Sequence, residues 1–178
     1  MTKWASRGLS GSALEEMINY TNEEYRKTKL ALIQKIPTPI TPVEFDNATR
    51  HITLAYFDQQ STVDYIGAVQ GIPVCFDAKE SKIDTVPLAN VHEHQMAFMD
   101  DFEKQDGIAF FILLLTHRDE LFYIPYRTMK RFWDRAEAGG RKSFTYDELD
   151  QAWRIVPGAG EPVPFLDLLQ KDLDERGE

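Results

Sequence analysis

Two aspartates and a lysine in the segment 62–79 have types and a spacing that could support metal-assisted chemistry. Asp64 and Asp77 are thirteen residues apart, and Lys79 follows Asp77 by two. A hairpin that turns at Gln70-Gly71 would bring the two carboxylates together, and on a strand Asp77 and Lys79 would share one face. Close carboxylates repel each other unless a cation lies between them, and oxygen ligands suit Mg²⁺ or Mn²⁺. The spacing therefore predicts an oxygen-ligated metal site.

Such a site could hydrolyse a phosphodiester. The metal would polarise the phosphate and lower the pKa of a bound water, while the Lys79 ammonium would orient that water or stabilise the charge of the transition state. Lysine suits this task because it is a compact charge with rotatable donors. The bare pattern is common, however, and it also fits a solvent-facing strand edge on which Lys79, Glu80 and Lys82 are ordinary surface charges.

The elements that must position these residues begin with a helix and an arm. Ser12 and Glu15 have the spacing of a capping box, and apolar residues recur behind them at helical spacing. After a short apolar strand, three closely spaced prolines exclude a helix and a central strand, and the next segment alternates and is rich in β-formers. We therefore expect a helix over 12–27, a strand over 30–33, and an arm whose prolines span 37–42 and whose returning strand spans 49–57.

Downstream of the predicted hairpin (62–69 and 72–79), the sequence indicates a second helix and a buried strand. Asn90 could cap the helix with Glu93 three residues on, and Met96 and Met99 would lie one turn apart. Gly107 opens an apolar run that is too short for a membrane helix and suits a strand buried on both faces. We expect that strand over 108–115, an antiparallel neighbour over 121–126, a helix over 126–137 that ends at a Gly-Gly pair, and short helices near 146–153 and 164–175.

Length and composition limit the class of protein. A chain of 178 residues that is 43% hydrophobic and 12% aromatic can build one compact domain. The net charge of −9 argues against a protein that coats nucleic acid non-specifically. The single Cys75 can form no internal disulfide and lies in an apolar run, so we expect a small buried side chain. No long apolar segment or apolar leader is present, which favours a soluble protein in the cytoplasm without a membrane partner.

The charge is unevenly distributed along the chain. The last eighteen residues carry six acids and two bases, a net −4. Positive charge gathers in two clusters, which are compatible with a phosphate-binding surface and do not by themselves indicate one. The first cluster is Arg26, Lys27 and Lys29, and the second is Lys130, Arg131, Arg135, Arg141 and Lys142.

Many short sequence words, in one order from Arg7 to about Arg141, give these residues a family context. They are Leu14-Glu-Glu-Met-Ile-Asn-Tyr-Thr-Asn22, Lys35-Ile-Pro-Thr-Pro39, Ala55-Tyr-Phe57, Ser61-Thr-Val-Asp-Tyr-Ile-Gly67, Phe76-Asp-Ala-Lys-Glu80, Pro87-Leu-Ala-Asn-Val-His-Glu-His-Gln95, Gln105-Asp-Gly107, Phe132-Trp-Asp-Arg135 and Gly140-Arg-Lys-Ser143. Together they resemble the RecU family of Holliday junction resolvases, and the order helix, hairpin, helix, strand resembles the PD-(D/E)xK nuclease core. The resemblance implies an α/β fold with a mixed central sheet flanked by helices, in a single nuclease domain over 1–178 with a protruding β stalk inserted at about 37–61.

The resemblance also assigns roles to individual residues. It implies that Thr62, Asp64, Asp77 and Gln95 occupy the family's metal positions and that Lys79 is its transition-state lysine, so that Asp64, Asp77 and Lys79 form the catalytic set with Mg²⁺ or Mn²⁺. Asp77 stands where the family usually has glutamate, a shorter reach that nuclease cores generally tolerate.

Two alternatives for neighbouring residues stay open. His92 and His94 could be a zinc pair, although i and i+2 on a helix face apart and neither a cysteine nor a third histidine nearby completes the set. Glu15 or Glu16 on the first helix could assist the site, as a helix acid does in many such nucleases, or Glu15 could serve only as the cap partner.

The stalk departs from the family pattern. It looks a few residues shorter, and its basic groups are limited to Arg50 and His51. The expected DNA contacts are Arg7, Arg50, Lys79, Arg141 and Lys142. The sparse charge of the stalk weakens the case for junction selectivity and leaves the case for cleavage intact.

The resemblance implies a homodimeric, magnesium-dependent endodeoxyribonuclease that nicks two symmetric strands of four-way junction DNA in recombination and repair. Possible partners are a strand-exchange recombinase or a branch-migration motor. The alternatives are a nuclease for flaps or ordinary duplex, and a junction-binding accessory protein without cleavage activity.

Overall fold

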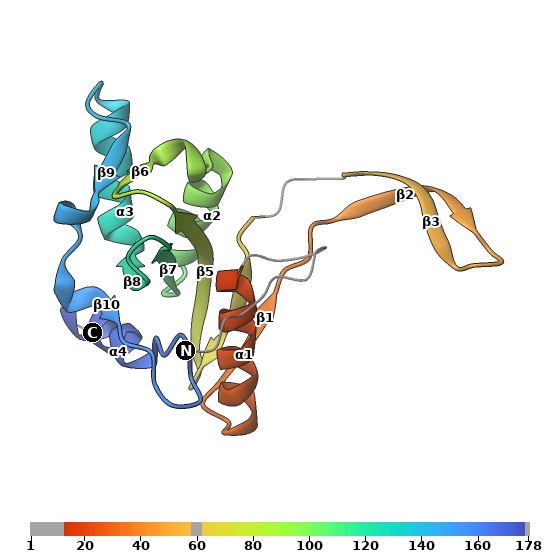
Figure 1. The fold of residues 1–178 in the computed structure, drawn as a ribbon, viewed down its shortest axis with the longest axis horizontal. Helices are drawn as coiled ribbons and strands as arrows, with labels where there is room; N and C mark the ends of the chain where they lie inside the picture. Colours follow the sequence, from red (N-terminus) through yellow and green to blue (C-terminus); the bar gives the residue numbers. More distant parts are fainter. Residues whose placement is uncertain (1–12, 58–61, 177–178) are drawn as a thin grey trace.

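A six-stranded mixed sheet forms the centre of the protein in the computed structural model, which describes residues 13–57 and 62–176 (Figure 1). Its strand order is β1-β4-β5-β7-β8-β10. β5 and β7 run parallel, and the other neighbouring pairs run antiparallel. The strands are β1 (Ala31–Lys35), β4 (Tyr65–Val69), β5 (Ile72–Ser81), β7 (Ile108–Leu115), β8 (Glu120–Pro125) and β10 (Arg154–Ile155).

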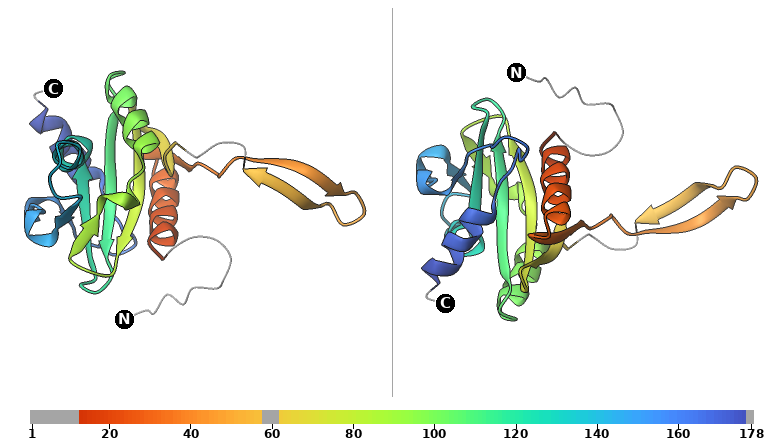
Figure 2. Two further views of the ribbon diagram at one scale, coloured as in Figure 1. Left: turned by 90° about the horizontal axis from the view of Figure 1, so that it is seen from above. Right: turned by 90° about the horizontal axis from the view of Figure 1, so that it is seen from below.

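Helices cover both faces of this sheet, as the end-on views of Figure 2 show. They are α1 (Ala13–Lys27), α2 (Glu93–Glu103), α3 (Tyr126–Glu137) and α4 (Leu166–Glu175). Side chains of α1 and α4 share one apolar core with the sheet, and side chains of α2 and α3 share the other. Because successive residues of a strand point to opposite faces, β7 is buried at all eight positions and contributes alternately to the two cores.

On the α1 and α4 face, aromatic rings form a ladder across the strands. Tyr65 stacks on Phe76, Phe76 on Phe110, and Phe110 on Tyr123, with ring centroids 4.7, 4.7 and 4.3 Å apart. Trp153 continues the ladder beyond β8. The Tyr65–Phe76 pair joins β4 to β5 and supports the register of this hairpin, which positions the two aspartates.

The arm is a separate two-stranded sheet that projects far from the body (Figures 1 and 2). It consists of β2 (Ile40–Asp46) and β3 (His51–Phe57), and Arg50 lies in the turn between them. Pro42 is accommodated because each strand of a two-stranded sheet is an edge, and the pairing is irregular just beyond it. The predicted β stalk is confirmed, and β2 and β3 stand clear of the six-stranded sheet in these views.

Most of the predicted elements are confirmed. The hairpin turns at Gln70 and Gly71, whose φ angles of 50° and 91° are both positive, as a tight two-residue turn requires. The first strand lies at Ala31–Lys35, one to two residues later than predicted. Cys75 is buried as expected, and burial raises the pKa of its thiol.

Three details differ from the predictions, and one prediction is not tested. Asn90 does not cap the second helix, because it ends a short 3₁₀ helix, η1 (Leu88–Asn90), and α2 begins after His92. The segment near 146–153 forms two 3₁₀ helices, η2 (Tyr146–Glu148) and η3 (Gln151–Trp153). The short strands β6 (Thr85–Pro87) and β9 (Ser143–Thr145), which pair with each other, and the two-residue β10 were not predicted. Ser12, the proposed cap of the first helix, lies outside the described residues.

The acidic C-terminal segment is part of the folded body. Asp172 on α4 is fully buried, and its carboxylate accepts hydrogen bonds from Tyr123 Oη at 2.8 Å and Arg176 Nε at 3.1 Å and pairs with Arg127. The acids of this segment therefore include a structural anchor. Among the described helices, none combines the length and apolar character needed to cross a membrane.

Candidate metal centre

Asp64 and Asp77 meet where β4 begins beside β5. Asp77 Oδ1 accepts a hydrogen bond from the Asp64 backbone N–H at 3.1 Å, and Asp64 Oδ2 accepts one from the Ala78 N–H at 2.9 Å. The register that pairs Tyr65 with Phe76 places Asp64, directly before β4, next to Asp77 on β5. The predicted juxtaposition of the two carboxylates is present in the structure.

Lys79 and Gln95 complete the cluster from two directions. Lys79, two residues after Asp77 on β5, places its Nζ 2.5 Å from Asp77 Oδ2. Gln95, in the first turn of α2, donates from Nε2 to Asp77 Oδ1 at 2.9 Å, and its Oε1 accepts from Lys79 Nζ at 3.2 Å. The same Oε1 accepts the His92 backbone N–H at 3.1 Å, which caps the start of α2 and fixes the amide orientation. Gln95 therefore joins α2 to both charged groups.

Asp77 is the most strongly perturbed member of the cluster. Its side chain is fully buried, and burial raises its pKa to about 7. The Lys79 ammonium opposes this shift in pKa, and the nearby Asp64 carboxylate adds to it. A carboxyl group that releases its proton near neutral pH is a ligand whose charge a bound cation would stabilise.

The donors present fit a hard divalent cation. Within the described residues, Asp77 Oδ2 has no hydrogen-bond donor in good geometry despite its burial, although it contacts Lys79 as an ion pair. In the same part of the chain, no three His, Cys, Asp or Glu side chains gather to hold a metal. A cation here would be held by two carboxylates, neutral oxygens and water, which is how Mg²⁺ is commonly bound, and the zinc alternative at His92 and His94 gains no third ligand.

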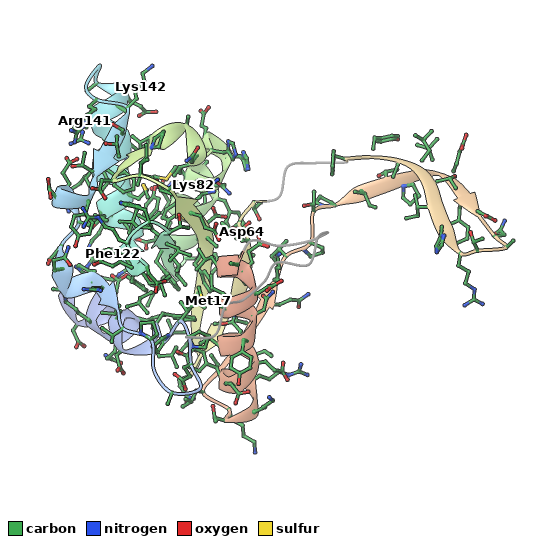
Figure 3. All side chains as sticks on the ribbon, viewed as in Figure 1. Met17, Asp64, Lys82, Phe122, Arg141 and Lys142 are labelled. Atoms are coloured by element: carbon green, nitrogen blue, oxygen red, sulfur yellow. The ribbon has the colours of Figure 1, made fainter. Side chains whose placement is uncertain are left out.

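Thr62 has a different setting from the other predicted metal ligands. It is exposed and lies two residues before Asp64, on the segment that returns from the arm. Figure 3 labels Asp64 close to this junction between arm and body. The structure brings Asp64, Asp77, Lys79 and Gln95 together through hydrogen bonds and an ion pair, and it places Thr62 at their edge.

The root of the arm lies against the same aspartate. The Ile36 N–H donates to the Asp64 carbonyl at 2.8 Å, and Lys35 Nζ pairs with Glu15 Oε2 on α1 at 2.8 Å. Glu15, Lys35, Thr38 and Asp64 line a hollow of about 360 Å³ together with Ile36 and Pro37. The sequence interpretation did not single out Lys35, although a lysine at the end of a strand and directly before the prolines was a usable signal.

Glu80 helps to position the first helix, whereas one alternative from the sequence took it for an ordinary surface charge. Its Oε1 accepts the Leu14 backbone N–H at 3.0 Å, which satisfies a donor in the first turn of α1. Lys79 and Glu80 are neighbours that face opposite sides of β5. The strand that carries the charged site therefore also anchors the first helix.

The predicted DNA contacts are dispersed. Arg7 lies outside the described residues, and Arg50 lies in the turn at the end of the arm. Arg141 is paired with Glu148. Lys142 lies in the loop after α3, and its carbonyl accepts the Leu88 N–H. Figure 3 shows Arg141 and Lys142 together at one end of the body, well separated from Asp64 in that view.

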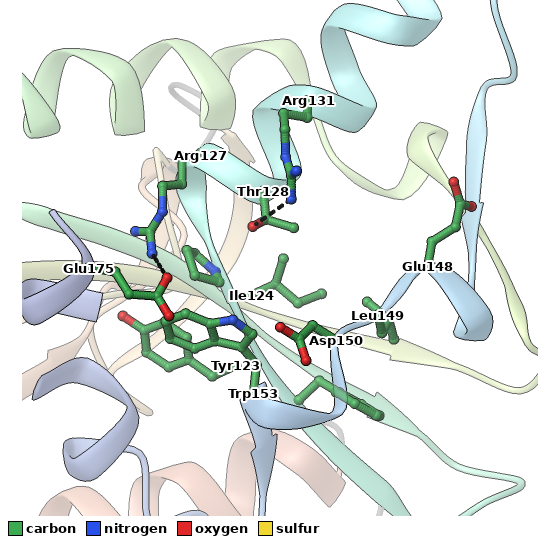
Figure 4. A pocket seen from close by; sticks show the side chains of 12 residues that line it. Tyr123, Ile124, Arg127, Thr128, Arg131, Glu148, Leu149, Asp150, Trp153 and Glu175 are labelled. Atoms are coloured by element: carbon green, nitrogen blue, oxygen red, sulfur yellow. Dashed lines mark hydrogen bonds and ion pairs between the residues drawn. The ribbon is translucent and has the colours of Figure 1, made fainter. Parts of the chain in front are cut away.

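A second, larger hollow lies apart from this cluster (Figure 4). It has a volume of about 490 Å³, with an apolar floor and charged walls that include Arg131 and Asp150. In Figure 4, Arg127 pairs with Glu175 at its rim, and Arg131 reaches toward Thr128. Neither aspartate of the metal centre lines it.

Comparison with known proteins gives this geometry its context. Residues 9–171 match the family model RecU, described as recombination protein U. The chain belongs to the RecU family. The Holliday junction resolvase RecU of Oenococcus oeni is 43% identical over 171 residues, which cover 91% of this chain and 83% of that protein. That of Oceanobacillus iheyensis is 40% identical over 158 residues, covering 86% and 79%, and that of Listeria innocua is 39% identical over 169 residues, covering 92% and 84%.

Among solved structures, this RecU family member is similar to Hjc, a Holliday junction resolvase from Archaeoglobus fulgidus, at 9% identity and a TM-score of 0.38. The match covers 62% of this chain and 77% of that one. The family assignment rests on the sequence relatives, and the order α1, β4-β5 hairpin, α2, β7 agrees with the helix, hairpin, helix, strand order expected for the RecU nuclease core.

Proposed function

We propose that this RecU family member is a metal-dependent endonuclease that resolves four-way DNA junctions. The observation that carries the proposal is the joined cluster of Asp64, Asp77, Lys79 and Gln95 at the root of a projecting arm. Its relatives named Holliday junction resolvase RecU support the substrate. Such an enzyme acts in recombination and repair.

The cofactor of this proposal is Mg²⁺ or Mn²⁺, held by Asp64 and Asp77 with oxygens of Thr62 and Gln95 or with water. A bound cation of this kind polarises the scissile phosphate and lowers the pKa of a water molecule. Ligation by Gln95 Oε1 requires that oxygen to exchange its hydrogen bond from Lys79 for the cation, because the amide nitrogen now faces Asp77. The Lys79 ammonium would then lose one of its acceptors and keep its ion pair with Asp77 beside the substrate.

Lys79 acts on the reacting phosphate in this proposal. Its side chain is only 16% exposed, so its charge is poorly screened by water. The ammonium orients the attacking water or stabilises the charge that accumulates on the phosphate oxygens as water attacks phosphorus and the 3′ oxygen leaves. The products are a 5′-phosphate and a 3′-hydroxyl.

We also propose a homodimer, in which two sites nick two symmetric strands and the arms enter the open centre of the junction. A two-fold enzyme matches the two-fold symmetry of the substrate. The proposed DNA contacts besides Lys79 are Arg7, Arg50, Arg141 and Lys142. A strand-exchange recombinase or a branch-migration motor remains a proposed partner.

The test is cleavage of a synthetic four-way junction with Mg²⁺ or Mn²⁺. We expect paired symmetric nicks from the wild type and none from Asp77→Ala, while junction binding persists in both. Asp101→Asn, which changes an exposed aspartate of α2, is the matched control and should cleave normally. Undiminished nicking by Asp77→Ala would contradict the assignment of the site.

The small positive charge of the arm favours a second candidate. With Arg50 and His51 as its basic groups, the arm offers few phosphate contacts, so flaps or ordinary duplex could be the preferred substrate of the same site. Cleavage of junction, flap and linear duplex at matched salt separates the two. Junction binding without any divalent-cation binding would instead indicate an accessory protein.

A further inference from the structure

Glu15 and Lys35 form an ion pair across the hollow that opens beside Asp64. Their charged atoms are 2.8 Å apart, and the side chains are 22% and 38% exposed. Lys35 supplies the cation among the residues that line this hollow, and Thr38 adds a hydroxyl group. A partly exposed pair of this kind is weak, so a phosphate could replace the carboxylate as the partner of Lys35.

Glu15 sits on a firmly held element. Its neighbour Leu14 is fully buried, and so is Ile18 one turn further along α1. The Leu14 N–H is also tied to Glu80 on β5, the strand that carries Asp77 and Lys79. The helix turn that carries Glu15 is therefore anchored to the body through β5.

Lys35 sits where the arm leaves the body. It is the last residue of β1, paired with Tyr65, and the next residue, Ile36, donates its N–H to the carbonyl of Asp64. Beyond Ile36 the chain runs through Pro37 and Thr38 to the arm. A change in the direction of the arm that loosens the Ile36–Asp64 hydrogen bond would also change the distance between Lys35 and Glu15.

We propose that Glu15 is a specificity-determining residue that keeps Lys35 from DNA until the arm is engaged. This inference rests on the proposed function. A DNA strand whose scissile phosphate lies at Asp64 and Asp77 has a neighbouring phosphate near the hollow that Asp64 also lines. In the free protein, the Glu15 carboxylate repels that phosphate and holds the Lys35 ammonium. A junction that seats the arm shifts the root, releases Lys35 to the phosphate and secures the strand, whereas linear duplex leaves the pair closed.

The variant Glu15→Gln tests this directly. It removes the negative charge and keeps a side chain of the same shape, so Lys35 becomes available to any DNA. We expect tighter binding and faster nicking of linear duplex, with little change for the junction, so that the preference for the junction falls. One added phosphate contact should steepen the dependence of log K on log salt by about 0.9 for the duplex.

Two controls test whether the effect comes from the Glu15–Lys35 ion pair, which we call the gate, or from a general change in charge. Glu16→Gln alters the charge of the same helix turn equally, and Glu16 does not line the hollow, so its duplex binding should change less. In the double variant Glu15→Gln/Lys35→Met, the added salt dependence should disappear, because the Lys35 ammonium that Glu15→Gln makes available is no longer present. Thermal unfolding of each variant checks that the fold is kept.

The outcomes distinguish this inference from the proposed function. If the wild type does not cleave junctions, the proposed function fails. If the wild type cleaves and Glu15→Gln matches Glu16→Gln on both substrates, the gate is refuted and the proposed function stands. Loss of cleavage of both substrates in Glu15→Gln, with weaker Mn²⁺ binding in calorimetry, would also overturn the gate, because it would make Glu15 part of the metal site.

Discussion

Asp64 and Asp77 each present a carboxylate oxygen to a backbone N–H on the other's side of the β4-β5 hairpin. Asp77 accepts from Asp64 N–H at 3.1 Å, and Asp64 accepts from Ala78 N–H at 2.9 Å. Both carboxylates are thus positioned by the main chain of the hairpin before any cation arrives. Pre-positioned ligands reduce the reorganisation that metal binding and catalysis require.

Metal binding should depend on pH through Asp77. Burial raises the pKa of Asp77 to about 7, with the Lys79 ammonium opposing and Asp64 adding to the shift. A cation needs the ionised carboxylate, so below about pH 7 the apparent affinity for Mn²⁺ should fall by up to about tenfold per pH unit, and above it the affinity should level off. Calorimetry at several pH values, in buffers of different ionisation enthalpy, measures both the affinity and the released proton.

The raised pKa of Asp77 has the opposite effect on the stability of the metal-free protein, which should fall as the pH rises. Because the folded pKa of Asp77 lies above its ordinary value of 3.8, the folded state holds the proton more tightly. The contribution of Asp77 to the free energy of unfolding is therefore largest below about pH 4 and is lost as the pH rises through about 7. Thermal unfolding in EDTA should show this loss relative to Asp77→Asn. Identical pH profiles for the two proteins would contradict the shift.

Gln95 should matter through its two hydrogen bonds inside the cluster. Gln95→Leu removes the donor to Asp77 Oδ1 and the acceptor for Lys79. Loss of such supporting contacts at metal sites typically costs about 10- to 100-fold in metal affinity or activity, and we expect that range here. Gln105→Leu, an exposed glutamine just beyond α2, is the control. Normal Mn²⁺ affinity and cleavage in Gln95→Leu would show that Lys79 and Asp77 need no such support.

Local patterns predicted the hairpin, the buried strand β7 and the arm well, because alternation, turn residues and proline spacing act over a few residues. The juxtaposition of Asp64, Asp77 and Lys79 followed from the same geometry. The predicted cap of α2 was wrong because Asn90 ends a 3₁₀ helix, so α2 begins after His92, whose N–H is satisfied by the side chain of Gln95.

Contacts between distant segments could not be predicted in this way. Glu80 accepts a backbone N–H of Leu14, 66 positions earlier in the chain, and β6 pairs with β9, which follows it in the chain only after α3. Such contacts depend on how the elements pack against each other. The local spacing of residues along one sequence does not reveal that packing. The role of Asp172 as the buried partner of Arg127 and Arg176 has the same origin.

Removal of the arm should separate cleavage chemistry from junction selection. β2 and β3 form their own sheet and leave the six-stranded sheet complete when replaced by a short Gly-Ser linker across 40–57. We expect the Mn²⁺ affinity and the melting temperature of the shortened protein to stay near wild type, while its preference for junction over duplex is lost. A gel-shift titration against both DNAs measures this preference. An unchanged preference would place junction recognition on the body.

The acidic C-terminal helix should be essential for stability through a single residue. Asp172 is fully buried and neutralises Arg127 and Arg176 while it accepts the hydroxyl of Tyr123. Asp172→Ala removes the acceptor of the Tyr123 hydroxyl and leaves Arg127 and Arg176 with only their pairs to Glu175 and Glu103 among the described ion pairs. Removing one partner of a buried ion pair typically costs about 3 to 5 kcal/mol in unfolding free energy. The partly exposed guanidiniums can recover some hydration, so we expect the lower end of that range in urea unfolding. Asp174→Ala on the same helix should cost much less, because the hydrogen bond that Asp174 accepts from Gln170 is exposed. Equal effects of the two substitutions would show that the helix is held by its apolar contacts instead, chiefly those of Leu169.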